Sequence, residues 1–312
     1  MKTTLCLAVI VTFHGSLVAA PRGWTSSDGK SAFQGDLIEF TETEVKIKRL
    51  PDFQIFKVAL ERLSDADQKY INGLLRERWR DEGLKNGPYA EKMTGQLVKA
   101  VSKQGLNYQI QGDPKWDGKK RYPLLIWLHG SGQSGDDNTS QIGGSPRNWL
   151  TPESQAKTPF VFIAPQCPSA EVGWKNAVAN NLMALIADLI ERLPVDQNRI
   201  YLTGSSMGGF GTWHLIGKYP QVFAAGVPLC GGGDSKQAEV LKDIPMWVFH
   251  GDQDDMVPVE RARTMVQAVK AAGGTYLQYT EFPGVGHSIT GIVYPRADLQ
   301  EWLFAQRRKR AE

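Results

Sequence analysis

Residues 96–312 alternate short apolar runs with stretches of helical periodicity. The runs are apolar at nearly every position, which is typical of strands that are buried on both faces of a sheet. Between two of these runs, residues 180–193 carry leucine and isoleucine at the spacing of one helix face. The alternation predicts an α/β fold with a mostly parallel sheet and helices on both of its faces. The predicted strands are residues 123–128, 160–164, 199–203, 224–229, 246–249 and 276–282.

A different pattern marks residues 21–71, where short extended segments follow one another closely. After the last of them, Ser64 has the position of a helix N-cap, and Asp67 stands where a capping box has its acidic residue. Several short strands closed by a helical turn predict a small β-barrel module. Residues 72–95 are charged and interrupted by glycine and proline, so we interpret them as a partly helical linker. The predicted strands of the module are residues 35–40, 45–48 and 53–58.

Residues 1–20 have the pattern of a secretory signal peptide. Lys2 precedes an apolar run from Leu5 to Phe13, and small residues end the segment at Ala20. The run is too short to span a bilayer, and no later segment is long and apolar enough to do so. We therefore expect a secreted or periplasmic protein without a membrane span. A buried N-terminal strand is the alternative, and Pro21 leaves the exact cleavage position open.

Composition and charge mainly exclude classes of partner. Hydrophobic residues make up 41% of the chain and charged residues 22%, which is ordinary for a globular protein. The 36 basic and 33 acidic residues give a net charge of +3, which is too even to imply a nucleic-acid partner. The basic residues at 307–310 suit the C-terminal end of a helix, where the helix dipole favours positive charge.

The cysteines leave two interpretations open. Cys6 lies in the predicted leader, so Cys167 and Cys230 remain in the mature chain. An exported protein could join them in a disulfide. The sequence does not show whether their Cα atoms come close enough, so two buried free thiols are the alternative.

A candidate nucleophile stands at the centre of Gly204-Ser205-Ser206-Met207-Gly208. This segment fits the pattern G-x-S-x-G, follows a predicted strand and precedes a helical pattern at 210–217, which is the context that the motif requires. A serine on a strained strand-to-helix turn needs glycine two residues away on either side, because side chains there would collide. We predict that Ser206 is the nucleophile.

Elimination among the five histidines selects a general base. His287 lies in a glycine-rich loop between the last predicted strand and a predicted final helix at 299–306, so its ring can reach over the strand ends. The others lie in the leader, at strand ends or inside the helix after the serine: His14, His129, His250 and His214.

The orienting acid is expected after the predicted strand at 246–249. Asp254 is the predicted acid, Asp255 is its rival, and Asp252 suits a role in bracing the turn. A carboxylate here would fix the imidazole tautomer and stabilise the imidazolium as it forms. The order Ser206, Asp254, His287 along the chain is that of α/β-hydrolases.

Backbone N–H groups must stabilise the oxyanion of an acyl-transfer intermediate. We predict that Met207, directly after the nucleophile, supplies one N–H group. Ser131, in the glycine-rich loop after the first strong strand, supplies the other. The chain contains no C-x-x-C, H-E-x-x-H or Walker motif, so we expect neither a metal nor a cofactor. Residues 135–138 fit a turn better than a cation site.

Taken together, the motifs of residues 106–306 resemble the bacterial phospholipase/carboxylesterase and predicted-peptidase branch of the α/β-hydrolases. The resemblance implies the hydrolase fold and a Ser-His-Asp triad, with Asp254 at the usual place of the acid, three positions before a Val-Pro pair. It also implies that Trp174 lines the substrate cleft, with a core tryptophan as the alternative. The resemblance rests on residues 127–132, 135–138, 164–168, 205–209, 230–234 and 284–287.

The N-terminal segment is similar to the Sla-one homology domain, a small SH3-like module found fused to hydrolases in some bacteria. The matching residues are Trp24-Thr25, Asp28-Gly29 and residues 63–67. The resemblance implies an interaction role toward a protein or cell-surface partner.

These observations predict a secreted serine esterase that forms an acyl-enzyme at Ser206. Its expected substrates are carboxylic esters, either small molecules or groups linked to plant polysaccharides, such as feruloyl and acetyl esters. A serine peptidase with the same site is one alternative. An inert hydrolase-like protein whose N-terminal module binds a partner is the other.

Overall fold

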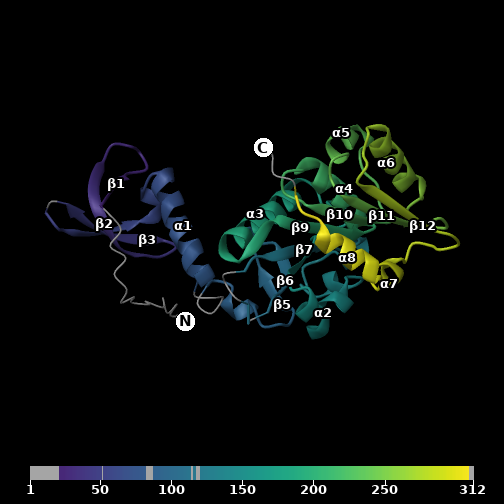
Figure 1. Ribbon diagram of the computed structural model, residues 1–312, viewed down its shortest axis with the longest axis horizontal. Helices are drawn as coiled ribbons and strands as arrows, with labels where there is room; N and C mark the ends of the chain where they lie inside the picture. The colour runs from purple at the N-terminus through teal and green to yellow at the C-terminus, as the bar shows by residue number, and fades with distance from the viewer. Residues whose placement is uncertain (1–20, 51, 82–86, 114, 117–119, 309–312) are drawn as a thin grey trace. The chain divides into compact units, whose positions relative to one another are not determined.

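The computed structural model describes residues 21–50, 52–81, 87–113, 115–116 and 120–308, and the chain divides after Glu77 into two compact units (Figure 1). Each unit has its own sheet, so each is described by itself. The predicted signal peptide, residues 1–20, lies outside the described residues.

The N-terminal unit is a four-stranded antiparallel sheet followed by a helix. Its strands are β1 (Arg22–Thr25), β2 (Ala32–Phe40), β3 (Glu44–Leu50) and β4 (Ile55–Ala59), in the order β1-β2-β3-β4. The short 3₁₀ helix η1 (Leu60–Arg62) leads into α1 (Asp65–Asp81), so the first part of the predicted linker is helical. The antiparallel sheet agrees with the predicted strands, whereas likeness to an SH3 barrel stays a prediction.

Trp24 and Asp67 hold this unit together. The Trp24 side chain is fully buried and its Nε1 donates to the carbonyl oxygen of Gly35 at 3.0 Å. The N–H of Asp67 donates to the Ser64 hydroxyl at 3.2 Å, which confirms the predicted N-cap. The Asp67 carboxylate in turn accepts the N–H of Thr25 at 2.9 Å and pairs with Arg22 at 2.6 Å. The first strand is therefore tied to the start of the helix.

The C-terminal unit is built on an eight-stranded sheet in the order β12-β11-β10-β9-β7-β8-β6-β5. The six strands from β12 to β8 are parallel, whereas β6 and β5 are paired antiparallel at one edge. Each predicted strand is present with shifted ends, as β7 (Tyr122–Leu128), β8 (Val161–Pro165), β9 (Val195–Ser205), β10 (Ala225–Leu229), β11 (Met246–Gly251) and β12 (Leu277–Phe282). The edge strands β5 (Val98–Val101) and β6 (Asn107–Gln111) were not predicted.

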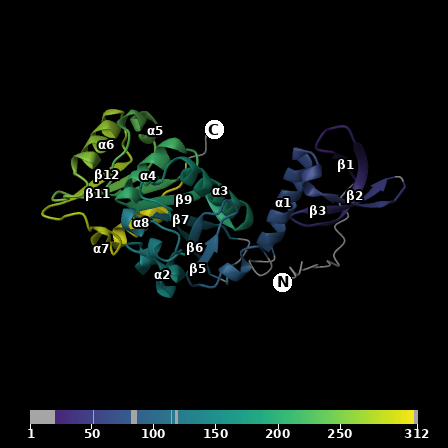
Figure 2. The ribbon, with the colours of Figure 1, turned by 180° about the vertical axis from the view of Figure 1, so that it is seen from behind.

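Helices cover both faces of this sheet (Figures 1 and 2). Strand β7 shows why, because Leu124, Ile126 and Leu128 pack into the core on one face while Leu125 and Trp127 pack into the core on the other. One core takes its helical side chains from α3 (Asn176–Arg192), α4 (Met207–Lys218), α5 (Ala238–Leu241) and α6 (Glu260–Ala271). The other takes them from η5 (Ser140–Ile142), η6 (Arg147–Leu150), α7 (Thr290–Val293) and α8 (Ala297–Ala305). The short helices η3 (Ala90–Lys92), η4 (Ser131–Gln133), α2 (Pro152–Lys157) and η7 (Ser235–Gln237) lie in the connections.

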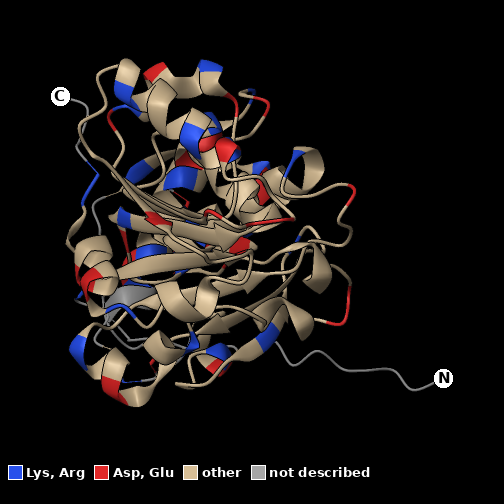
Figure 3. Ribbon diagram, turned by 90° about the vertical axis from the view of Figure 1, so that its right-hand side faces the viewer, with Lys and Arg blue, Asp and Glu red and all other residues tan. Residues whose placement is uncertain are grey.

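Acidic and basic residues are interspersed on the outer helices of this unit (Figure 3). Several form local pairs, such as Arg192 with Asp188 at 2.8 Å and Arg263 with Glu281 at 2.6 Å. Among the described residues, no helix is both long and apolar enough to cross a membrane.

Candidate active site

Ser206 stands on a strained turn between β9 and α4. Its backbone has φ 57° and ψ −119°, a conformation that non-glycine residues rarely adopt. A Cβ on Gly208 would lie 1.9 Å from the carbonyl oxygen of Leu128, and one on Gly204 would lie 2.5 Å from the carbonyl oxygen of Gly208. These approaches confirm that the glycines on either side of Ser206 are required by close backbone packing.

Replacing Gly208 by alanine should therefore destabilise the C-terminal unit by about 3 kcal/mol or more, because the new methyl group meets backbone that cannot swing away. Thermal unfolding of Gly208→Ala against the parent chain measures the effect. Gly291→Ala is the matched control, since a Cβ there meets nothing within 4 Å. A Gly208→Ala chain that unfolds at the temperature of the control would contradict the expectation.

Asp254 and His287 form a hydrogen-bonded pair. His287 Nδ1 lies 2.7 Å from Asp254 Oδ2, although the two residues are far apart in the chain. The Asp254 side chain follows β11 and is buried, whereas His287 lies in the loop after β12 with 15% of its side chain exposed. The neighbouring Asp255 is exposed. The structure thus brings Asp254, rather than its rival, into contact with the histidine.

Hydrogen bonds keep the Asp254 carboxylate ionised. Burial by itself raises the pKa of this carboxyl, but hydrogen bonds from the N–H of Val257, from His287 and from the N–H of Met256 outweigh it, so the pKa is lowered. A negative charge on Asp254 is what stabilises a positive charge on the adjacent imidazole.

A second histidine contacts the same carboxylate, and the sequence analysis did not assign it this role. His250 Nε2 lies 3.1 Å from Asp254 Oδ2 and 2.8 Å from the carbonyl oxygen of Val257, and its side chain is fully buried. Because both neighbours are acceptors, Nε2 carries the proton and donates to them. The sequence offered one signal for this contact, which is that His250 stands only four residues before Asp254.

Cys230 connects the serine and histidine segments. It directly follows β10, whose Leu229 carbonyl accepts the N–H of Ser206 at 3.0 Å, and its thiol donates to the carbonyl oxygen of His287 at 3.3 Å. The segments of Ser206 and His287 therefore meet at the carboxyl edge of the sheet. A hydrogen bond between the Ser206 hydroxyl and the His287 ring stays a prediction.

The loop that carries Ser131 lies against the elbow. A Cβ on Gly130 would be 3.5 Å from the Cβ of Ser206, and Ser131 begins η4 immediately afterwards. Met207 is the first residue of α4, where backbone N–H groups have no partner within the helix. Among the described residues, nothing accepts a hydrogen bond from either the Ser131 or the Met207 N–H. Both N–H groups are thus available to bind an oxyanion. That they point at the same oxyanion stays a prediction.

His129 holds this loop in place as a neutral ring. The N–H of Cys167 donates to His129 Nε2 at 2.9 Å, so the ring proton is on Nδ1, which donates to the carbonyl oxygen of Gly130 at 2.7 Å. Burial lowers the pKa of His129 to about 4. Both ring nitrogens are occupied, and His129 is therefore a structural residue rather than a base.

Trp174 lies in the core next to this loop. Its side chain is buried, its Nε1 donates to the carbonyl oxygen of His129 at 3.1 Å, and its ring meets the His129 ring edge-on with centroids 5.0 Å apart. A Cβ on Gly211 of α4 would come within 2.6 Å of it. Trp174 therefore packs against His129 and stabilises the loop that carries Ser131. Contact between Trp174 and substrate stays a prediction.

Among the described residues, one group has the composition of a possible metal site. It consists of Cys230, Asp254 and His287, whose potential ligand atoms lie within 4.8 Å of one another. Burial and the charge of Asp254 raise the pKa of the Cys230 thiol, which keeps it protonated, and a metal here would break the Asp254–His287 hydrogen bond.

Cys167 and Cys230 are both buried free thiols, as one of the two interpretations expected. Asp137 accepts hydrogen bonds from Thr139, Ser140 and Gln166, so residues 135–138 form the expected turn.

Comparison with known proteins places this site in context. Residues 116–293 match the family model described as Phospholipase/Carboxylesterase. Probable feruloyl esterase C of Aspergillus flavus is 27% identical over 194 residues, which cover 61% of this chain and 70% of the relative. Carboxylesterase SOBER1 of Arabidopsis thaliana is 28% identical over 194 residues, which cover 54% of this chain and 84% of the relative. The solved structure of a thermostable esterase superposes with a TM-score of 0.61 at 34% identity, covering 68% of this chain and 63% of that one.

Proposed function

The chain belongs to the phospholipase/carboxylesterase family and is a carboxylic ester hydrolase with the α/β-hydrolase fold, and we propose that it is a serine esterase that forms an acyl-enzyme on Ser206. One observation carries the proposal, the Asp254–His287 hydrogen bond of 2.7 Å at the edge of the sheet where the strained elbow presents Ser206. The elbow leaves Ser206 partly exposed, and the pair supplies a base whose orientation is fixed.

In the proposed mechanism the hydroxyl oxygen of Ser206 attacks the ester carbonyl carbon while His287 Nε2 accepts the hydroxyl proton. The negative Asp254 carboxylate, held by two backbone N–H groups, stabilises the imidazolium that results. The N–H groups of Ser131 and Met207 bind the oxyanion. The imidazolium then protonates the departing alcohol, and water releases the acid from Ser206 by the same steps in reverse order.

The proposed substrates are esters of the kind that the relatives' names mention, with feruloyl and acetyl esters linked to plant polysaccharides as the first candidates. Rates on p-nitrophenyl acetate, methyl ferulate and a peptide p-nitroanilide test this proposal. We expect kcat/KM for the better ester to exceed that for the anilide by about a hundredfold or more, because an amine leaves only when it is protonated. Faster cleavage of the anilide would favour the peptidase alternative.

His250 enters the proposal as a positioning residue. Its Nε2–H contacts Asp254 Oδ2, the same oxygen that His287 Nδ1 meets. His250→Phe removes this donor, so we expect kcat for p-nitrophenyl acetate to fall about tenfold with little change in KM. His250→Gln keeps a donor and should recover part of the loss. An unchanged kcat in a folded His250→Phe protein would show that Asp254 needs no such support.

Export and partner binding also belong to the proposal. The pattern of Lys2 and the apolar run after it supports secretion, and N-terminal sequencing of the mature protein tests it by showing whether the chain begins near Pro21.

The N-terminal unit is proposed as an interaction module. Two of its apolar residues are exposed, Phe53 at 60% and Ile55 at 62%.

A further inference from the structure

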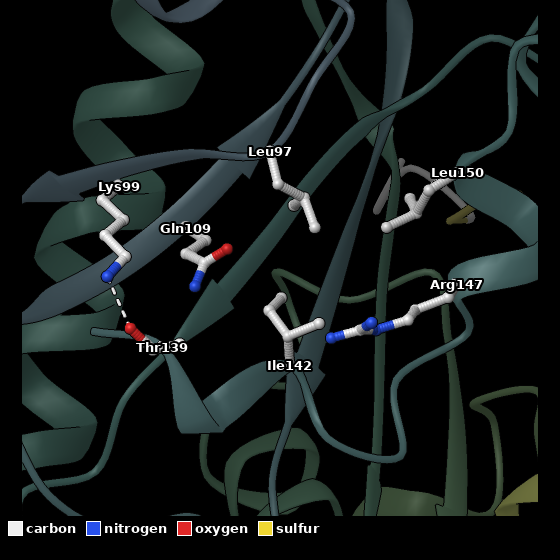
Figure 4. Close-up of a pocket in the computed structure, with 7 residues that line it drawn as sticks. All are labelled: Leu97, Lys99, Gln109, Thr139, Ile142, Arg147 and Leu150. Atoms are coloured by element: carbon white, nitrogen blue, oxygen red, sulfur yellow. Dashed lines mark hydrogen bonds between the residues drawn. The ribbon is translucent and has the colours of Figure 1, made fainter. Parts of the chain in front are cut away.

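A hollow of about 350 Å³ opens on the C-terminal unit (Figure 4). One wall comes from the antiparallel edge of the sheet, where Lys99 lies on β5 and Gln109 on β6. The facing wall comes from residues 139–150, which include η5 and η6. Its volume is within the range of small-molecule sites, and no residue of the proposed triad or oxyanion hole lines it.

The middle of the hollow is apolar. Leu97, Ile142 and Leu150 line it, and the last two are buried members of the core that also contains Trp127. Their side chains are held by packing, so they present a fixed apolar surface. A ligand that covers this surface gains by removing it from water.

Two cations flank the apolar surface from opposite sides. Figure 4 shows the Arg147 guanidinium extending towards Ile142, across the hollow from Lys99. Lys99 Nζ donates to the Thr139 hydroxyl and, at 3.5 Å, to the carbonyl oxygen of Asp137. Both acceptors are neutral, and within the described residues neither Lys99 nor Arg147 forms an ion pair with a carboxylate.

Within the described residues, the Asp137 carboxylate forms no ion pair with either cation. The Asp137 carboxylate is turned towards Thr139, Ser140 and Gln166, which donate three backbone or side-chain hydrogen bonds to a single oxygen, Oδ1. Lys99 meets the backbone oxygen of Asp137 instead. Because no carboxylate of the described residues pairs with the Arg147 guanidinium, its forked donors are available for a carboxylate that enters the hollow.

From this arrangement we infer that the hollow is a second binding site, which takes a hydroxylated aromatic carboxylate. The carboxylate binds the Arg147 guanidinium, and the ring lies on Leu97, Ile142 and Leu150. A hydroxyl at the far end of the ring reaches the Lys99 ammonium or the Gln109 amide. An apolar ring between two polar ends matches the order of the lining along the hollow, and the inference does not depend on which esters the enzyme cleaves.

Binding of 4-hydroxybenzoate to the chain with Ser206 blocked by a phosphonate tests the inference, because the blocked serine prevents binding at the proposed catalytic site. Isothermal titration should show one saturable site. Arg147→Gln should weaken binding at least tenfold, and Lys99→Gln should weaken it less. Lys157→Gln, an exposed basic residue on α2 outside the hollow, is the matched control and should change nothing.

4-Hydroxybenzyl alcohol, which has the same ring without the carboxylate, should bind at least tenfold more weakly than the acid. Thermal unfolding of each variant shows whether the fold is intact. Absence of saturable binding to the parent chain would overturn the inference. Equal affinity for acid and alcohol, or affinity within twofold of the parent in a folded Arg147→Gln protein, would do so as well.

Discussion

Replacing Ser206 by alanine is expected to lower kcat for p-nitrophenyl acetate by about 10⁵–10⁶-fold, because the acyl-enzyme can no longer form. The residual rate would come from the oxyanion hole and substrate binding alone. The fold should persist, since the elbow depends on the close backbone contacts of Gly204 and Gly208 rather than on the hydroxyl. Steady-state kinetics, with circular dichroism as a check on folding, measure the loss.

Ser205→Ala is the matched control for this experiment. Ser205 is the last residue of β9 and has no glycine two residues before it, so we expect its replacement to leave kcat within a fewfold of the parent. A fluorophosphonate should label the parent and Ser205→Ala but not Ser206→Ala. Labelling or turnover that survives in Ser206→Ala would end the proposed mechanism, although the fold and the family would stand.

The second large effect is expected at the acid. Asp254→Asn should reduce kcat by about 10⁴-fold, because an amide cannot stabilise the imidazolium and favours the wrong tautomer of His287. The side chain keeps its size, so the two backbone N–H groups of Met256 and Val257 still have an oxygen to bind. The rate, measured with the ester preferred by the parent enzyme, should fall without a matching rise in KM.

Asp255→Asn separates this effect from a general loss of negative charge in the loop. Asp255 is exposed and adjacent in the chain, so its replacement should leave kcat within about twofold of the parent. Equal losses of kcat in Asp254→Asn and Asp255→Asn would show that the reaction does not depend on the contact between Asp254 and His287.

The nucleophile segment was predictable because its constraints are local. The turn, the strand before it and the helix after it lie within residues 195–218, and the close approaches of Gly204 and Gly208 explain why the motif has glycine at both positions. The apolar strands were predictable for a similar reason. A strand buried on both faces, such as β7, must be apolar at every position.

Elements at the edge of the sheet gave weaker signals. Strand β5 is the edge of the sheet and carries Lys99, whereas Gln109 and Gln111 of β6 are buried and donate to the carbonyl oxygens of Asn138 and Leu150 in the covering loop. Helix α6 was not predicted either, although Met265, Val266 and Val269 are spaced as one buried helix face. That signal was present in the sequence.

The site was predictable in part. Elimination selected His287, and the resemblance to the hydrolase family selected Asp254. The contact between them depends on long-range packing, which the structure supplies. The position of Trp174 could not be derived, because a tryptophan after a turn can face either a cleft or the core. The contact of His250 with Asp254 depends on the path of the loop after β11, because Asp254 lies beyond Gly251, the last paired residue of the strand.

The two buried thiols have a practical consequence. Cys167 donates to the carbonyl oxygens of Ser169 and Gly173, and Cys230 to that of His287, so each is already engaged with backbone in its reduced form. Neither thiol needs an oxidant for the C-terminal unit to reach its native state. Recombinant material can therefore be made in a reducing bacterial cytoplasm, and dithiothreitol can stay in every assay buffer.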